Sequence, residues 1–166
     1  MDFLELVKKR RSIRKYKPEP IPEEKIDYIL EAARQAPSWG NRQCWRFIVV
    51  KDESKKRKIA SRDWIAQAPI IIIGCAYPGL SGSKSGQQYY MLDMGIAMEH
   101  MMLAAAEQGL GTCWIGGQFD EETVKNILNI PSEVRVVALT PLGYPDESPN
   151  PRDRKPLNEF VSYDEW

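Results

Sequence analysis

The sequence predicts a single layered domain of the α/β or α+β class, in which helices cover a mixed β-sheet. Helical and extended patterns alternate along the 166 residues, giving about five helices and four core strands. Residues 69–76 form a continuous apolar run, as expected for a central strand that is covered on both faces. Residues 86–109 form a long, almost entirely apolar helix pattern, which belongs inside a protein.

Before the central strand, the sequence predicts three helices and one further strand. Residues 2–9 predict a short helix with apolar side chains on one face, and residues 23–35 predict an amphipathic helix with Pro22 at its first position. Residues 45–51 are rich in β-branched and aromatic side chains, which favours a strand. Residues 52–61 are charged and predict an exposed helix, whose basic run is interpreted as a solvated face.

The C-terminal half begins with a Gly/Ser-rich segment, residues 77–86, which is short enough to be a mobile lid. After the long helix, the sequence predicts a strand at 112–115, a helix at 120–128 and a strand at 134–142. Residues 144–156 contain four prolines and predict an extended arm. Residues 157–163 carry enough apolar side chains for a terminal strand or a docked segment.

The long helix pattern raises a packing problem. Two dozen helical residues would span ~36 Å, which is about the width of a small domain. A chain of 166 residues can hardly surround such a helix alone, so one helix face is expected to pack against a second subunit. Four ionisable residues interrupt the pattern (Asp93, Glu99, His100 and Glu107), so no uncharged stretch reaches the ~18 residues of a membrane span.

The composition excludes several classes of function. The formal net charge is zero, which gives no reason to expect binding to nucleic acid or to an anionic membrane. Three cysteines without a CxxC motif argue against disulfides and zinc or iron–sulfur sites. The N-terminus has no apolar signal-peptide core, because the sequence becomes charged after Val7. We therefore expect a cytoplasmic protein.

Two basic segments could bind an anion. RRSIRKY at residues 10–16 combines arginines with a hydroxyl group, and forked guanidinium donors match a phosphate. A solvated basic turn is the more common interpretation of such a segment. A second basic group, residues 152–155, lies on the proline-rich arm and could converge on the same phosphate, although spacing alone does not show it.

The segment GLGTCWIGG at residues 109–117 is not a dinucleotide-binding loop, because it follows a helix and opens a strand. Gly116 and Gly117 suggest a backbone that approaches a large flat group, and an ordinary tight turn is about equally compatible with them. His100 is the only histidine and sits among methionines, which favours a packing role. Since the side chains offer no nucleophile or general-base pair, an enzymatic function would require a bound cofactor.

Taken together, the motifs resemble the FMN-dependent nitroreductase family over nearly the whole chain. The matching segments are RRSIRKY (10–16), APSWGNRQCWRFIVV (36–50), APIIII (68–73), LDMGIAMEHMMLAAAEQGLGTCWIGG (92–117), PLGYP (141–145) and RDRKPLNEFV (152–161). The resemblance implies one FMN-binding domain, residues 1–166, with an α+β three-layer fold. It also implies an intertwined homodimer with FMN at the interface and with arm 144–166 packed on the partner subunit.

The resemblance assigns cofactor-binding roles to fifteen residues of this sequence. Four lie in the first basic segment and two on the arm, where they would hold the FMN phosphate and its surroundings: Arg10, Arg11, Ser12, Arg14, Arg152 and Arg154. Five belong to a loop that would reach the flavin of the other subunit: Pro37, Ser38, Trp39, Asn41 and Gln43. Four would lie against the isoalloxazine ring, with the Gly116 N–H near N5: Trp114, Ile115, Gly116 and Gly117.

The implied reaction is a ping-pong transfer in which NADH or NADPH reduces FMN, and a small-molecule acceptor then takes the reducing equivalents. Nitroaromatic, quinone-like and similar conjugated acceptors are the first hypothesis, with no catalytic side chain and no metal. Alternatives are another flavin reaction, namely dehalogenation, dehydrogenation or flavin breakdown, and a flavin-binding sensor or storage protein. A basic nucleic-acid-binding module is the least favoured. Trp39 stands where the family often has a small residue, so it is expected to stack on the substrate side of the flavin or gate it.

Overall fold

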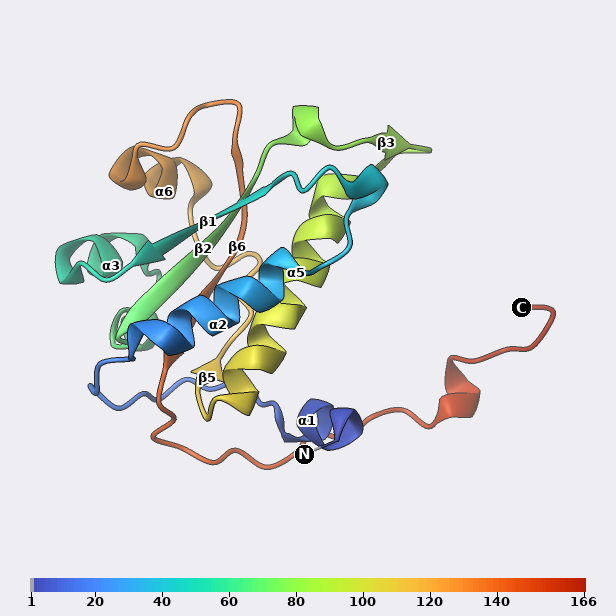
Figure 1. Ribbon diagram of the computed structural model, residues 1–166, viewed down its shortest axis with the longest axis horizontal. Coiled ribbons are helices and arrows are strands. Elements are labelled where there is room, and N and C mark those ends of the chain that lie inside the picture. The colour runs from blue at the N-terminus through green and yellow to red at the C-terminus, as the bar shows by residue number, and fades with distance from the viewer. Residues whose placement is uncertain (1) are drawn as a thin grey trace.

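The computed structural model describes residues 2–166 and confirms an α+β fold with three layers (Figure 1). The α-helices are α1 (Phe3–Lys9), α2 (Glu23–Arg34), α3 (Glu53–Ile59), α4 (Asp63–Ala66), α5 (Tyr89–Glu107) and α6 (Glu121–Leu128). The strands are β1 (Trp45–Val50), β2 (Ile70–Ala76), β3 (Ser83–Lys84), β4 (Gln87–Gln88), β5 (Gly111–Thr112) and β6 (Arg135–Gly143). Short 3-10 turns occur at Trp39–Asn41, Pro78–Leu80 and Leu157–Glu159.

The main sheet has the strand order β1-β2-β6-β5, and each of its ladders is antiparallel. A β-bulge shifts the register of β2 against β6 between Gly74 and Cys75. The parallel component expected for a mixed sheet is reduced to one bridge, which joins Ser12 to Thr112 at the edge of the sheet. This bridge matters for the site because it attaches the first basic segment to β5.

Strand β2 is the centre of the molecule, and all seven of its residues are buried. Ile70 and Ile72 belong to the core shared with α2 and α5, whereas Ile71 and Ile73 belong to the core on the opposite face with α3 and α6. Successive side chains of a strand point to opposite faces, so an uninterrupted apolar run suits a strand covered on both sides. At Gly74 a Cβ would lie 2.7 Å from the Met94 sulfur, so this glycine allows α5 to pack closely.

Helix α5 is shorter than the predicted element. It begins at Tyr89 because the preceding residues form the β3–β4 hairpin, in which Ser85 and Gly86 adopt positive φ angles of 53° and 80°. The segment expected to be a mobile lid is therefore a 3-10 turn followed by a tight hairpin. Nineteen residues still span ~28 Å. No helix in the described part of the chain is long and apolar enough to cross a membrane.

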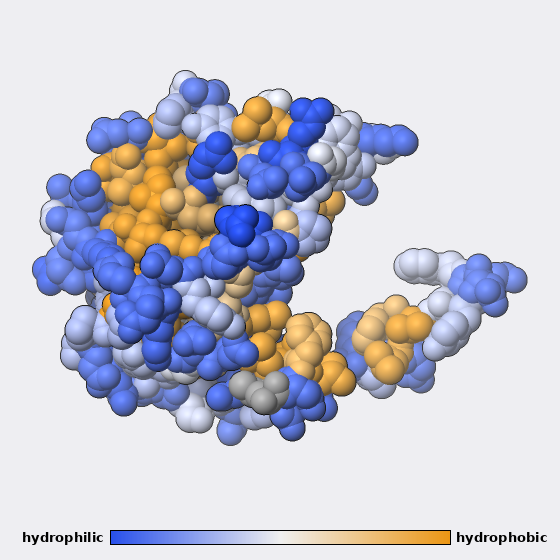
Figure 2. Space-filling model, in the orientation of Figure 1, coloured by the Kyte–Doolittle hydropathy of each residue, from blue (hydrophilic) through white to orange (hydrophobic). Residues whose placement is uncertain are grey.

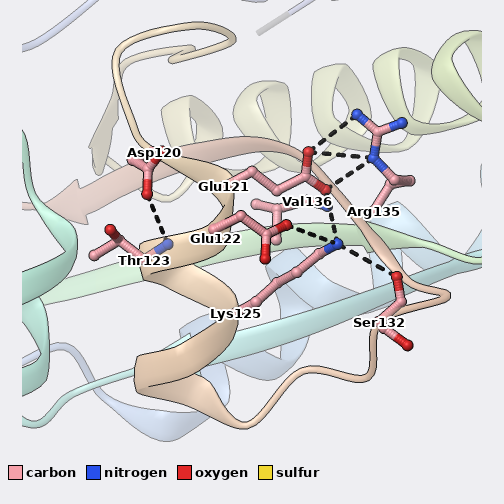
Figure 3. A network of polar contacts seen from close by, with 8 residues as sticks. All are labelled: Asp120, Glu121, Glu122, Thr123, Lys125, Ser132, Arg135 and Val136. Carbon is pink, nitrogen blue, oxygen red and sulfur yellow. Dashed lines mark hydrogen bonds and ion pairs between the residues drawn. The ribbon is translucent and has the colours of Figure 1, made fainter.

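Helix α6 is attached to β6 by a network of charged groups (Figure 3). The Glu121 carboxylate accepts hydrogen bonds from the Arg135 guanidinium at 2.9 and 3.0 Å and from the Val136 N–H at 2.9 Å. Lys125 lies 3.4 Å from the same carboxylate. The hydrogen bond from Arg135 is the main cause that lowers the pKa of Glu121 to about 2. The carboxylate is therefore ionised at neutral pH and holds the helix against the strand.

The two ends of the chain are poorly packed against the rest of the molecule. Helix α1 contains no buried residue, although a capping box between Asp2 and Glu5 stabilises its first turn. Residues 151–166 are exposed throughout and extend away from the body, ending far from it (Figure 1). The predicted terminal strand is absent from residues 157–163, where the only regular element is the 3-10 turn at Leu157–Glu159, and none of these residues is buried against its own chain. Apolar side chains are exposed on α1 and on the arm, and the space-filling view shows an open gap between the arm and the body (Figure 2).

Candidate functional site

The first basic segment is an extended strand-like connection at the edge of the sheet. The Ile13 N–H donates to the Thr112 carbonyl at 2.8 Å, and the Lys17 N–H donates to the Tyr144 carbonyl at 2.9 Å. Ile13 and Tyr16 are buried, which fixes the segment against the body. Arg14, by contrast, is exposed between them. The segment is therefore anchored by Ile13 and Tyr16, while the arginines between and before them stay partly or fully exposed.

The C-terminal arm is brought to this segment by Glu147. Its carboxylate accepts hydrogen bonds from the backbone N–H groups of Arg14 and Lys15, the latter at 3.2 Å. The Asp146 N–H donates to the Lys15 carbonyl at 2.9 Å. These contacts hold the start of the arm beside the first basic segment. The arm residues that follow line the same cavity as that segment. Sequence analysis assigned no role to Glu147, because one carboxylate in a proline-rich arm forms no recognisable motif.

A cavity of about 490 Å³ forms between the two basic segments. Five arginines line it, and all five were predicted from the sequence: Arg10, Arg11, Arg14, Arg152 and Arg154. Ser12 also lines it and adds a hydroxyl group. The structure thus brings the two basic groups together, which spacing alone did not show.

The charges in this cavity strongly favour an anion. Among the described lining residues, Glu99 of α5 is the single carboxylate, and it lies 3.6 Å from Arg10 Nε. The remaining arginines have no carboxylate within ion-pair distance, and Arg154 contacts only backbone carbonyls. Guanidinium groups carry forked N–H donors that match the oxygens of a phosphate. The cavity can therefore hold a phosphate group.

The segment predicted to support a flat group follows β5 directly. Ile115 is buried and exchanges hydrogen bonds with Leu139 of β6 at 3.0 and 2.9 Å, which fixes the backbone on both sides of it. Trp114 is 41% exposed and points outward. A Cβ on Gly116 would lie 2.8 Å from Trp114 Nε1, so the glycine lets the backbone pass close to the indole. Gly117 faces open space.

A second hollow, of about 350 Å³, lies beside this segment. It is lined by Trp114, Ile115 and Gly116, and also by Arg14, which lines the basic cavity as well. Arg14 therefore joins an anion-binding cavity to a surface with an exposed indole and a bare peptide backbone. An organic ligand with an anionic group at one end and a planar ring at the other fits this arrangement.

Two residues of the second hollow were missed by sequence analysis. Arg62, the N-cap of α4, and Trp64 of α4 line it, and the Arg14 guanidinium lies 5.9 Å from the centre of the Trp64 ring. The sequence predicted a charged helix ending at residue 61 and no further helix before the central strand. A lone arginine after a basic run has no distinguishing pattern. That basic run is not wholly the solvated face predicted, because Lys56 is 1% exposed and its Nζ donates to the Ala68 carbonyl at 2.6 Å.

The predicted loop, residues 37–43, does not reach either cavity. It lies at the other end of α5, beside the hairpin, whereas α1 and the basic segment lie near the C-terminal end of that helix (Figure 1). Its backbone is tightly turned, with positive φ angles at Gly40, Asn41 and Gln43. The Ser38 hydroxyl accepts a hydrogen bond from the Gln43 N–H at 2.9 Å. One chain therefore separates the predicted binding residues into two groups.

The ionisable side chains near the cavities do not form a catalytic pair. Burial raises the pKa of the Cys113 thiol and that of the Tyr16 hydroxyl, so both groups keep their protons at neutral pH. His100 lies with Nδ1 3.3 Å from the Ala32 carbonyl, in the packing between α5 and α2. The site can bind and orient a ligand, and reactivity would come from the ligand itself.

Comparison with known proteins gives a consistent family assignment. The family model described as "Nitroreductase family" matches residues 7–64 and 60–144. A nitroreductase family protein from Clostridium novyi NT has a solved structure that is 40% identical in sequence, with a TM-score of 0.84, and the match covers 100% of this chain and 95% of that one.

Two curated relatives have named activities. An "FMN reductase [NAD(P)H]" from Bacillus subtilis is 31% identical over 175 residues, covering 93% of this chain and 70% of the relative. An "Iodotyrosine deiodinase" from Thermotoga neapolitana is 31% identical over 180 residues, covering 95% of this chain and 94% of the relative. The similarity extends over the segments that carry both cavities.

Proposed function

Because the chain belongs to the nitroreductase family, we propose that it is an oxidoreductase that uses FMN and NAD(P)H to reduce a small conjugated acceptor, such as a nitroaromatic compound or a quinone. The observation that carries this proposal is the continuity of the site. Arg14 lines both the cavity with five arginines and the hollow beside Trp114 and Gly116. The distinct requirements of a phosphate and of a planar ring are met side by side.

The five arginines and Ser12 would hold the phosphate and the polar chain next to it. Arg10 keeps its orientation through Glu99 at 3.6 Å, and the Glu147 carboxylate fixes the backbone at Arg14 and Lys15. Preorganised donors lose little freedom on binding, which raises the affinity for an anionic ligand. This part of the site anchors the cofactor and takes no part in electron transfer.

Trp114–Gly117 would lie against the isoalloxazine ring. Without a Cβ at Gly116 or Gly117, the backbone N–H groups can approach the ring edge, where they stabilise negative charge. When bound, FMN supplies the redox chemistry by accepting a hydride from NAD(P)H and passing the reducing equivalents to the acceptor. The residues of this chain position the ring, exclude water from its buried face and leave the other face accessible.

A second copy of the chain would complete the site. Helix α5 has a largely apolar stripe on which Leu92 and Ile96 are exposed, Gly95 and Leu103 are partly exposed, and Glu99 is the charged member. Gly95 has open space where its Cβ would be. Two such helices can pack closely along a stripe of this kind, which answers the packing problem raised by the sequence. The loop at residues 37–43, remote from the cavities of its own chain, would then reach the flavin of the partner. Residues 144–166 would pack on that partner.

The first test is spectroscopic. Purified protein should be yellow with bound FMN, and anaerobic NADH or NADPH should bleach the flavin band before an added quinone or nitroaromatic compound restores it. A colourless protein that does not bind added FMN would refute the proposal. Yellow protein that neither nicotinamide reduces would indicate a flavin sensor or a different electron donor.

The phosphate cavity is tested by Arg14→Ala. Loss of a charge-assisted contact should weaken FMN binding by about 10- to 100-fold, measured by fluorescence titration of the apoprotein. Arg57→Ala is the matched control, because Arg57 is an exposed arginine on α3 and lines neither cavity. Equal FMN affinity in both variants would show that the phosphate lies elsewhere.

Reductive dehalogenation is the second candidate, because the Thermotoga neapolitana relative matches 95% of this chain. The same FMN-loaded protein should therefore be offered a halogenated tyrosine and a quinone in parallel. Faster reoxidation by the halogenated tyrosine, with release of halide, would favour this candidate. Reoxidation by the quinone alone would favour the first.

A further inference from the structure

Trp39 is held on several sides and is not a free side chain. Its ring stacks on Tyr89 of α5, with the ring centres 5.7 Å apart and the planes inclined by 8°. The Arg42 guanidinium lies 5.9 Å from the centre of the indole. The indole is still 42% exposed, so the prediction that Trp39 stacks on the substrate side of the flavin stays a prediction, while these neighbours limit its movement as a gate.

Gly82 provides the space that the Trp39 ring fills. A Cβ at this position would lie 2.6, 2.7 and 2.8 Å from three atoms of the indole, so any other residue would displace the ring or the hairpin. An aromatic ring cannot yield by bending, unlike the end of a flexible chain. Gly79, three residues earlier in the same segment, has nothing within 4 Å of its Cβ position. The close fit therefore belongs to Gly82 and not to the segment as a whole.

Asp93 of α5 connects the loop that carries Trp39 to the turn before the hairpin. It is 3% exposed on the largely apolar helix α5, and its carboxylate accepts a hydrogen bond from the Trp39 N–H at 2.8 Å. It also accepts from the Ser81 hydroxyl at 3.2 Å and from the Cys44 thiol at 3.5 Å. Burial, with the nearby Asp93 charge, raises the pKa of Cys44 to about 11, so the thiol keeps the proton that it donates. A buried carboxylate is tolerated because it is bonded in this way.

These contacts join the loop at 38–44 to a distant part of the sequence, namely the turn and hairpin at 78–88 and the helix α5 that follows them. We propose that Asp93 and Gly82 are positioning residues that lock Trp39, so that the loop and the hairpin form one fixed wall on the acceptor side of the flavin cleft instead of a mobile lid. The inference about the cleft rests on the proposed function, whereas the locking itself does not. The acceptor would then be selected by the shape of a preformed wall.

The locking is tested without cofactor, by hydrogen–deuterium exchange of the apoprotein. Gly82→Ala lies in the hairpin segment but should speed exchange about tenfold or more in the loop at 38–44 as well, because displacement of Trp39 releases both segments. Gly79→Ala should leave both segments unchanged. Faster exchange in the hairpin segment alone would overturn the proposal, as would equal effects of the two variants.

A Trp39→Ala background tests the close fit between the indole and Gly82 directly. If the effect of Gly82→Ala comes from a clash with the indole, it should disappear once the indole is removed, and the two changes should be non-additive. Asp93→Asn keeps the side-chain shape but loses the charge and replaces one acceptor oxygen with a donor. It should speed exchange in the loop and in the turn at 78–81. Additive effects in the double variant, or unchanged exchange in Asp93→Asn, would refute the lock.

The enzymatic consequence is read from the steady-state kinetics of the FMN-loaded protein. Gly82→Ala should raise the KM for a quinone acceptor by about tenfold and change kcat per bound FMN by less than about twofold, because the wall touches the acceptor and does not hold the phosphate. Gly79→Ala should match the parent protein. An unchanged acceptor KM with released exchange would limit the lock to a structural role and overturn the positioning role. Loss of all flavin activity in the parent protein would instead refute the proposed function.

Discussion

Two regions of the molecule differ in how their apolar side chains are covered. One is the interior around β2, and the other is the surface made by α1, the exposed stripe of α5 and the C-terminal arm. Around β2, each face of the strand is covered by helices of the same chain, and no buried side-chain N or O in the described residues lacks a hydrogen-bond partner. On the second surface, apolar side chains such as Phe3, Leu92 and Phe160 are more than half exposed. One chain covers the apolar side chains of the first region, and it leaves those of the second region exposed.

This difference shows which part of the molecule one chain can specify alone. The apolar side chains of β2 pack against helices of the same chain, so their burial stabilises the fold of one chain directly. The exposed stripe on α5 has the same apolar character but gains nothing until a second surface covers it. Since the predicted binding residues are divided between the two ends of α5, we expect the exposed surface to belong to the site as well.

The strongest way to break this comparison is Leu92→Asp in the exposed stripe. Leu92 is 54% exposed in one chain, so the monomer should tolerate the change. In a symmetric dimer, two carboxylates would enter the apolar interface, and the dissociation constant should rise by about 1000-fold or more. Sedimentation velocity over a range of protein concentrations measures this, with Ser54→Asp on the exposed face of α3 as the control for added charge.

Flavin content should follow assembly in that experiment. If the loop at residues 37–43 completes the partner's site, the Leu92→Asp monomer should lose FMN while its far-UV circular dichroism stays close to that of the parent. A dimer that survives the substitution would show that this stripe is not the interface, and a monomer that keeps its flavin would show that one chain is sufficient. Either outcome would contradict the comparison.

A smaller effect is expected from Ile72→Ala in the complete region. Ile72 is fully buried in β2, and its truncation removes apolar area and leaves a cavity, which should lower the free energy of unfolding by about 3 kcal/mol. Because its neighbours are in the same chain, the loss should not depend on protein concentration. Urea unfolding at two concentrations of the Leu92→Asp monomer checks both points, and a loss below 1 kcal/mol would mean that β2 is not the centre of the core.

The same distinction explains how much could be predicted from the sequence. The long helix and the central strand could be predicted because each is a long, nearly uninterrupted apolar stretch, and the order of the other strands and helices followed from their local apolar patterns. The helix was predicted to begin too early, at residue 86, because Gln87 and Gln88 of the hairpin do not interrupt the apolar pattern strongly. Other features depend on contacts between remote segments, which leave no local pattern in the sequence. These features are the position of Arg62, the hydrogen bonds of Glu147 to the basic segment and the packing of Trp39.

The smallest effect concerns the charged network that holds α6 to β6. The folded-state pKa of Glu121 is lowered from 4.5 to about 2, mainly by the Arg135 hydrogen bond. Its contribution to stability is therefore fully present above about pH 4.5 and is lost as the pH falls toward 2. Glu121→Gln should cost about 1 kcal/mol at pH 7, and the difference from the parent should shrink across this window.

Urea midpoints at pH 7, 4 and 2.5 would follow this difference, with Glu122→Gln as the control on the same helix. Glu122 is 77% exposed and lies 3.6 Å from Lys125, so its loss should change the midpoint less at each pH. If Glu121→Gln and the parent lose stability in parallel between pH 4.5 and 2, the network does not fix α6. The complete region would then depend on apolar packing alone, and its contrast with the open surface of α5 would lie in burial and not in charge.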